Sequence, residues 1–183
     1  MNEEIDIKSN RRNLVILFSI GFVPLVFSWV VFFYFPELMP STTTNEGQLI
    51  SPPVQASELG LGSEFGKWTL LVPVQGDCDE ACEQRFYLAH QVNIALGKES
   101  ERVQRMLIDI GANTGVLIRL AEEFPEQAVA KVPGETFRRL LKDDSAIYLM
   151  DPVGNVFMAY SQEKAGKPML KDIKHLLKIS NLG

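Results

Sequence analysis

The sequence Trp68-Thr-Leu-Leu-Val-Pro-Val-Gln-Gly-Asp-Cys-Asp-Glu-Ala-Cys82 joins an apolar run, a glycine and two cysteines. Because its first seven residues carry no charge and are mostly apolar, they predict a buried strand from Trp68 to Val74. The residues after the glycine predict a helix over Asp79 to Leu96. Cys78 and Cys82 are the only cysteines of the 183-residue chain. We therefore expect any sulfur chemistry to take place where this strand passes into this helix.

Cys78 is predicted to be the reactive sulfur. If the helix opens with Cys78, the sulfur lies among amide N–H groups at the positive end of the helix dipole, which favours thiolate over thiol. Cys82 would follow one turn later, with the two Cα atoms roughly 6 Å apart, which allows a disulfide or capture of a soft metal ion by two thiolates. Four carboxylates oppose the dipole by raising the thiol pKa, and the sequence leaves this balance open. They belong to Asp77, Asp79, Glu80 and Glu83.

The elements after the first helix alternate between strand and helix. They are predicted at 104–110 (strand), 114–124 (helix), 128–132 (strand), 135–141 (helix), 145–150 and 155–160 (a hairpin) and 168–179 (helix). The hairpin turns at Asp151-Pro-Val-Gly154, where proline fits a turn position and glycine tolerates positive φ. This order predicts an α/β fold, a thioredoxin-like sheet flanked by helices and preceded by one N-terminal transmembrane helix. In that fold, cysteines after the first main strand occupy the redox position.

The transmembrane helix is predicted from residues 14–35, an uncharged run of 22 residues. As a helix it would be about 33 Å long, and the hydrocarbon core of a bilayer is about 30 Å thick. A cleaved signal peptide has a shorter apolar region of about 7 to 15 residues and a small-x-small cleavage site. Here Pro36-Glu-Leu-Met-Pro40 follows instead. We therefore predict an uncleaved anchor.

Basic residues predict the orientation of this anchor. Lys8, Arg11 and Arg12 precede the span, and no Lys or Arg follows it until Lys67. The positive-inside rule then places the N-terminus in the cytoplasm. The C-terminal domain would lie outside the cytoplasm, in the periplasm of a Gram-negative bacterium with the anchor in the inner membrane, where disulfides persist.

Four segments are predicted along the chain. They are a cytoplasmic tail (1–13), the transmembrane helix (14–35), a linker (36–66) with room for a short strand at Gln48–Ile50, and the folded domain (67–183). The net charge is −5, and residues 1–35 contribute none of it because three basic side chains cancel three acidic ones. An acidic domain argues against a nucleic-acid partner.

Three stretches are informative together: Gly66-Lys-Trp-Thr-Leu-Leu71, Cys78-Asp-Glu-Ala-Cys82 and Ser145-Ala-Ile-Tyr-Leu-Met-Asp-Pro-Val-Gly154. They resemble the first core strand, the CxxxC motif and the strand with an Asp-Pro-x-Gly turn of the SCO/SenC family. Proteins of that family are membrane-anchored, thioredoxin-like and assist cytochrome c oxidase assembly. The resemblance covers about residues 67–180, and the anchor matches as well.

The resemblance implies copper(I) bound by Cys78, Cys82 and a histidine just before the Ser-x-x-Tyr-Leu strand, for delivery to the dinuclear copper centre of the oxidase. A second implied role is reduction of the cysteines of that centre. Asp144 stands where the histidine is expected, and Asp79 and Glu83 stand where the family usually has prolines. Since copper(I) prefers thiolate and imidazole to carboxylate, we expect Asp144 to weaken a copper site.

The other metal-ligand side chains have ordinary explanations. His90 and His175 are expected to be surface or boundary residues of helices. Met150 and Met158 lie at period-2 spacing on the hairpin strands, which indicates core packing.

Carboxylates at strand ends and in loops are usually solvated. Those of Asp109, Asp143 and Asp144 are nevertheless expected near the cysteine loop. There a carboxylate could accept a proton during thiol–disulfide exchange, which we treat as a hypothesis.

Three functions fit these residues. The first is an assembly factor for a respiratory cytochrome c oxidase that acts as a thiol–disulfide oxidoreductase: Cys78 attacks, Cys82 resolves the mixed disulfide and a thiol reductant supplies electrons. Its partners would be an oxidase subunit or other assembly factors. The second is a copper(I) chaperone for the oxidase copper centre, with the missing ligand supplied by the client or by a mobile side chain. The third is a non-catalytic scaffold in which the cysteine pair is a structural or relic disulfide.

Overall fold

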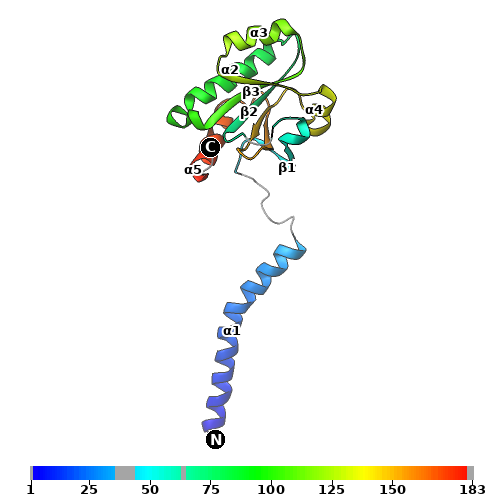
Figure 1. The fold of residues 1–183 in the computed structure, drawn as a ribbon. Helices are drawn as coiled ribbons and strands as arrows, with labels where there is room; N and C mark the ends of the chain where they lie inside the picture. Colours follow the sequence, from blue (N-terminus) through cyan, green and yellow to red (C-terminus); the bar gives the residue numbers. More distant parts are fainter. Residues whose placement is uncertain (1, 36–43, 63–64, 181–183) are drawn as a thin grey trace. The chain divides into compact units, whose positions relative to one another are not determined.

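The structure is a computed structural model that describes residues 2–35, 44–62 and 65–180. The chain divides into two compact units, Met1–Thr43 and Thr44–Gly183. In the first unit, helix α1 (Asn2–Tyr34) contains the predicted apolar run. Its part from Arg11 to Tyr34 is long and apolar enough to cross a membrane. Figure 1 shows α1 as a helix that is continuous through Pro24.

The described part of the second unit is built on a six-stranded mixed sheet with the order β1-β6-β5-β2-β3-β4. Strands β2, β3 and β4 are parallel, β5 is antiparallel to β2, and β6 is antiparallel to both β5 and β1. The strands are β1 (Gln48–Gln55), β2 (Trp68–Gly76), β3 (Val103–Ala112), β4 (Gln127–Lys131), β5 (Ile147–Met150) and β6 (Asn155–Tyr160).

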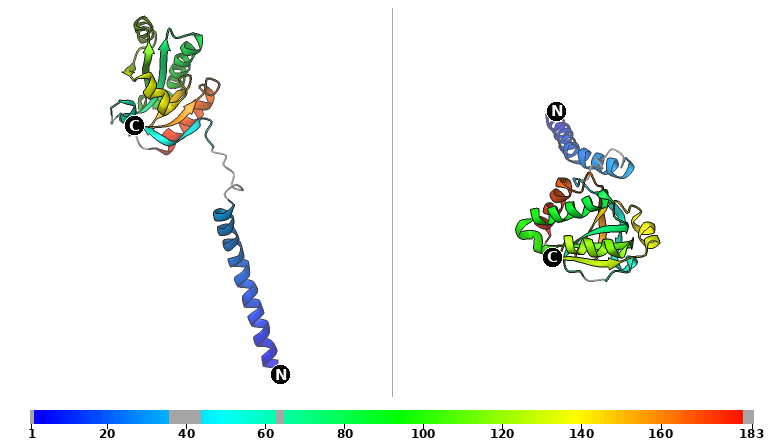
Figure 2. Two further views of the ribbon diagram at one scale, coloured as in Figure 1. Left: turned by 90° about the vertical axis from the view of Figure 1, so that its right-hand side faces the viewer. Right: turned by 90° about the horizontal axis from the view of Figure 1, so that it is seen from above.

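Helices cover both faces of this sheet (Figure 1, Figure 2). One face packs against α2 (Glu80–Ala95), α3 (Thr114–Glu123) and α5 (Lys167–Ile179), and the other against α4 (Gly134–Leu141) and the 3-10 helix η2 (Ala56–Leu59). A second 3-10 helix, η3 (Gly97–Arg102), follows α2. The predicted α/β class and the predicted elements from β2 onward are confirmed to within a few residues at their ends.

Strand β2 is apolar from Leu70 to Val74 because it is buried on both faces. Leu70, Val72 and Val74 belong to the core under α2, whereas Leu71, between them, belongs to the core under α4. A central parallel strand covered on both sides has no solvent face that would need polar residues. Its position at the middle of the sheet places its carboxyl end, and the cysteines that follow, at the edge where α2 begins.

The start of the folded unit differs from the prediction of a linker over residues 36–66. Residues 48–59 form β1 and η2 and belong to the folded unit, whereas residues 36–43 and 63–64 lie outside the described residues. The short strand allowed at Gln48–Ile50 is the first part of β1. The rest of β1 was not predicted because prolines remove ladder donors and argue against a strand. Pairing with β6 involves only the two ends of β1, at Gln48 and Leu49 and again at Val54 and Gln55. The prolines therefore lie where the ladder is interrupted.

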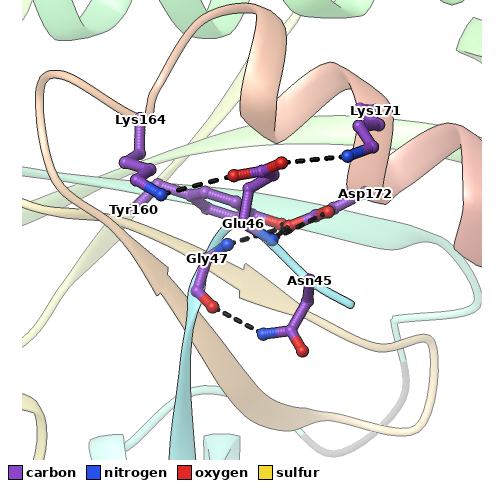
Figure 3. Close-up of polar contacts among 7 residues, drawn as sticks. All are labelled: Asn45, Glu46, Gly47, Tyr160, Lys164, Lys171 and Asp172. Carbon is purple, nitrogen blue, oxygen red and sulfur yellow. Dashed lines mark hydrogen bonds and ion pairs between the residues drawn. The ribbon is translucent and has the colours of Figure 1, made fainter. Parts of the chain in front are cut away.

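A buried carboxylate holds the beginning of this unit (Figure 3). Asp172 of α5, 5% exposed, accepts hydrogen bonds from the backbone N–H of Glu46 (2.8 Å) and of Gly47 (2.9 Å). The hydroxyl of Tyr160 lies 3.2 Å from the same carboxylate, and burial raises the Tyr160 pKa. We call Glu46, Gly47, Tyr160 and Asp172 the Asp172 clamp. It ties the residues just before β1 to β6 and α5.

Two features strengthen the Asp172 clamp. The Glu46 carboxylate forms ion pairs with Lys171 (2.9 Å) and Lys164 (3.3 Å). At Gly47 an added Cβ would lie 2.6 Å from Cε1 of the Tyr160 ring, closer than non-bonded atoms approach, so only glycine fits without a shift of its neighbours.

Candidate functional site

The two cysteines form a disulfide at the junction of strand and helix. Strand β2 ends at Gly76 and α2 begins at Glu80, and the Cys78 and Cys82 Cα atoms are 5.2 Å apart. This separation lies within the range that a disulfide spans and close to the value expected from the spacing. The sulfur pair thus lies at the point of the fold that the sequence predicts.

The conformation of Cys78 differs from the prediction. Cys78 precedes the helix instead of opening it, and its φ is +52°, a left-handed conformation that costs an L residue about 1–2 kcal/mol. Asp79 is the N-cap, and its carboxylate accepts a hydrogen bond of 2.9 Å from the backbone N–H of Cys82. A helix amide that was expected to favour a thiolate is therefore bonded to a carboxylate. The predicted contribution of the helix terminus to Cys78 reactivity is correspondingly reduced.

Both cysteines line a surface hollow of about 440 Å³, which we call the cysteine hollow. Both cysteines are buried residues of the core under α2, Cys78 at 7% and Cys82 at 3% exposed. The hollow is lined by Gln75, Asp77, Cys78, Asp79, Cys82, Arg85, Asp144 and Ser145. A larger hollow of about 770 Å³ beside β1 and α4 contains neither cysteine and has no part in this chemistry.

Asp144, at the position of the expected histidine, lines the cysteine hollow as the sequence predicted. Its carboxylate lies 3.2 Å from the Arg138 guanidinium of α4. Arg138 also donates a 2.6 Å hydrogen bond to the side chain of Gln75 at the end of β2. The Asp144 carboxylate is therefore paired with Arg138 of α4, and the same arginine links α4 to the end of β2.

Arg85 is the residue of the cysteine hollow that the sequence analysis missed. It lies on α2 one turn after Cys82 and is 7% exposed. Its Nε–H has no hydrogen-bond partner among the described residues. Burial lowers the pKa of the guanidinium, and the carboxylates of Asp79, Asp144 and Asp143 act in the opposite direction. The spacing Cys82-x-x-Arg85, which brings two side chains to one helix face, is the signal that could have identified it.

The other predicted carboxylates have structural contacts. Asp109 is buried at the end of β3, where its carboxylate accepts hydrogen bonds from the backbone N–H groups of Gly111 and Ala112. Asp143 accepts hydrogen bonds from the backbone N–H and the hydroxyl of Ser145. Neither Asp109 nor Asp143 lines the cysteine hollow. Of the three proposed proton acceptors, Asp144 is the one that the structure brings beside the disulfide.

Neither the histidines nor Met150 and Met158 line the cysteine hollow. Met150 and Met158 are buried in the core, as predicted. His90 packs against the ring of Phe124, and burial lowers its pKa, with a smaller contribution from Arg105. His175 is on the exposed side of α5.

The donor set of the cysteine hollow does not fit copper(I) as it stands. Among the described residues, no group of three or more His, Cys, Asp or Glu side chains is placed to hold a metal ion. The two sulfurs are bonded to each other, and Asp144 supplies a carboxylate paired with Arg138. A soft cation prefers thiolate and imidazole, and the neighbouring Arg85 charge would repel it.

Comparison with known proteins agrees with this architecture. Residues 68–180 match the sequence family described as "Transmembrane-like, thioredoxin-like, C-terminal domain". The chain belongs to this family. In this thioredoxin-like family member, the matched region runs from the first residue of β2 to the end of α5 and includes both cysteines. The comparison with curated proteins gave no match.

Solved structures similar to this thioredoxin-like chain include three bacterial proteins. Copper-bound ScoI from Bradyrhizobium japonicum is 14% identical, with a TM-score of 0.48 over 73% of this chain and 99% of that one. An SCO1/SenC family lipoprotein from Bacillus anthracis is 15% identical, with a TM-score of 0.49 over 73% and 94%. A putative thiol:disulfide interchange protein DsbE from Chlorobium tepidum is 19% identical, with a TM-score of 0.47 over 62% and 82%. SCO/SenC proteins are thus among the solved structures that are similar to this chain.

Proposed function

We propose that this protein is a membrane-anchored, extracytoplasmic assembly factor for cytochrome c oxidase that acts by thiol–disulfide exchange. The observation that supports it best is the Cys78–Cys82 disulfide in the cysteine hollow, beside a carboxylate where a copper site would need a soft ligand. The oxidase as client comes from the resemblance to the SCO/SenC family. The anchor is the apolar part of α1, and the basic residues at the N-terminal end of that helix, Lys8, Arg11 and Arg12, support a cytoplasmic N-terminus.

The exchange would proceed in balanced steps. A dithiol reductant gives two electrons to the resting disulfide and leaves as a disulfide, with Cys78 and Cys82 reduced. The Cys78 thiolate then attacks a client disulfide, forming a mixed disulfide and releasing one client thiolate. Cys82 attacks the Cys78 sulfur of the mixed disulfide, which releases the second client thiolate and restores the resting bond. The position of Cys78 in the turn before α2, with Cys82 inside the helix, supports its role as the attacking residue.

The test uses the full-length protein in detergent. Millimolar dithiothreitol should reduce the disulfide of the folded protein, and the reduced protein should in turn reduce a disulfide-bonded model peptide. Cys78→Ser should lose this transfer, whereas Cys82→Ser should trap the peptide as a mixed disulfide on Cys78, visible by mass spectrometry. A disulfide that dithiothreitol reduces only after unfolding would contradict the proposal.

One observation favours copper(I) transfer as the second candidate function. A Cα separation of 5.2 Å would allow both thiolates to reach one ion once the disulfide is reduced. Copper(I) titration of the reduced protein separates the candidates, because tight 1:1 binding that Cys78→Ser abolishes would support the chaperone. Asp144→His, which supplies the imidazole that the hollow lacks, should bind copper(I) more tightly than the wild-type protein.

A further inference from the structure

Arg85 brings a positive charge into the cysteine hollow. The side chain comes from α2, the helix that also carries Cys82, and it lines the hollow together with both cysteines. The residue is more than nine-tenths buried, and its Nε–H has no hydrogen-bond partner within the described part of the chain. A buried donor without an acceptor is costly, so such atoms are rare in folded proteins.

Nearby carboxylates do not supply the missing acceptor. Asp79 uses a carboxylate oxygen to cap the N–H of Cys82, and Asp144 is paired with Arg138. Both carboxylates favour the charged form of Arg85 from a distance, as Asp143 does. The guanidinium therefore stays charged, and its buried Nε–H has no partner among the described residues, while the side chain lines the hollow.

Opening the disulfide would create an anion in the same hollow. An incoming thiolate attacks the sulfur of Cys78, the slightly less buried of the two residues, and forms a new S–S bond there. As the Cys78–Cys82 bond breaks, its electron pair stays on the Cys82 sulfur as a thiolate. Cys82 is 3% exposed, and a buried anion needs a cation or hydrogen-bond donors. Arg85 is at i+3 from Cys82, the spacing of neighbours on one helix face.

We propose that Arg85 is a positioning residue that stabilises the Cys82 thiolate formed when the disulfide opens, through its unpartnered Nε–H and its charge. This inference rests on the thiol–disulfide exchange proposed above. It explains how a thiolate forms in a hollow whose carboxylates repel it. Those carboxylates belong to Asp77, Asp79 and Asp144, which line the hollow, and to Asp143, whose charge acts on Arg85; Arg138 faces the hollow's Asp144 as its ion-pair partner.

The test compares four forms of the full-length protein in detergent: wild type, Arg85→Met, Arg85→Lys and Arg119→Met. Arg119 is the matched control, because it is an exposed arginine that pairs with Glu83 on α2 (2.7 Å) and does not line the cysteine hollow. The reduced fraction of each protein is measured against glutathione redox buffers by alkylation and mass spectrometry. The rate of reduction by dithiothreitol is measured by the same trapping.

Arg85→Met should shift the equilibrium toward the disulfide roughly tenfold, because one charge-assisted hydrogen bond to the reduced form is lost. A tenfold shift lowers the reduction potential by about 30 mV. Reduction should also slow by roughly tenfold, since a less stabilised thiolate is a poorer leaving group. Arg85→Lys should recover most of both losses because it keeps the charge, and Arg119→Met should stay within about twofold of wild type.

The outcomes separate this inference from the proposed function. If wild type exchanges and a folded Arg85→Met behaves identically, the role of Arg85 is wrong and the exchange function stands. If the wild-type disulfide resists glutathione and dithiothreitol, the exchange function fails and the inference fails with it. If Arg85→Met does not fold, Arg85→Gln is measured in its place, because glutamine keeps an N–H donor and lacks the charge. An Arg85→Gln protein with wild-type equilibrium and rate would overturn the role of the charge.

Discussion

The Asp172 clamp and the cysteine hollow each bury a charged side chain, and they differ in how that charge is satisfied. Asp172 is 5% exposed and receives two backbone N–H groups, with the Tyr160 hydroxyl beside it. Arg85 is 7% exposed and has a buried Nε–H without a partner among the described residues. A satisfied buried charge stabilises the native state and has little capacity left for a ligand. A buried charged group with an unpaired donor beside a reactive bond indicates where an opposite charge develops during the reaction.

This contrast predicts that substitutions in the two regions affect different measurements. Changes in the Asp172 clamp should lower stability and leave the redox equilibrium of the disulfide unchanged. Changes at Arg85 should alter the redox equilibrium. Substitutions at three positions of the clamp test this separation.

Asp172→Ala is the clamp substitution with the largest expected effect. It leaves the N–H groups of Glu46 and Gly47 without an acceptor, and we expect the free energy of unfolding to fall by about 3 kcal/mol. Asp172→Asn keeps one acceptor oxygen and should cost about 1 kcal/mol. Urea unfolding followed by circular dichroism measures both. A folded Asp172→Ala protein should keep the glutathione equilibrium of the disulfide within about twofold of wild type, well below the tenfold shift expected from loss of one charge-assisted bond. A larger shift would contradict the separation of the two regions.

Gly47→Ala should have the next largest effect. Its Cβ would meet the Tyr160 ring at 2.6 Å and the Met158 sulfur at 2.7 Å, and relief of such overpacking costs about 1–3 kcal/mol. The measurement is the midpoint of urea unfolding. Gly62→Ala is a suitable control, since nothing lies within 4 Å of the added Cβ and the φ of Gly62 is not left-handed. Equal stability of the two variants would show that the close approach at Gly47 is unimportant.

Glu46→Gln should have the smallest effect, and that effect should depend on pH. Hydrogen bonds from Lys171 and Lys164 hold the pKa of Glu46 below its usual value of 4.5. Because the folded pKa is lower than the unfolded one, the stabilisation is present above pH 4.5 and is lost as the pH falls through the folded pKa. The difference in unfolding midpoint between wild type and Glu46→Gln should therefore be largest at neutral pH and low salt. A difference that persists unchanged at pH 3 or in 1 M salt would contradict an electrostatic origin.

The elements from β2 onward could be predicted because their signals are local. The uninterrupted apolar run of β2 indicates a central strand, and the Asp-Pro-x-Gly turn between β5 and β6 indicates a hairpin. Strand β1 could not be predicted in the same way, since Pro52 and Pro53 argue against a strand and its pairing partner lies about one hundred residues away. Its position depends on β6 and on the buried Asp172, which no local pattern reveals.

The candidate site could be predicted in its position and only partly in its details. The spacing of Cys78 and Cys82 located the sulfur pair, and Asp144 was correctly expected beside it. The left-handed conformation of Cys78 depends on how the turn after β2 closes. The sequence does not indicate this conformation, because a positive φ is uncommon for a residue other than glycine. Arg85 was missed because a charged residue on a helix is normally solvent-exposed, and only the packing around α2 makes it buried.

The most direct test of the central claim is the reduction potential of the Cys78–Cys82 disulfide in the folded full-length protein. Structural disulfides typically have potentials below about −300 mV, whereas exchangeable ones are more oxidising. Equilibration with glutathione and dithiothreitol buffers, followed by alkylation and mass spectrometry, gives the value. We predict a potential above about −300 mV, with the protein still folded when reduced. A potential below that value would contradict a role in exchange and identify the bond as a structural link between the end of β2 and α2.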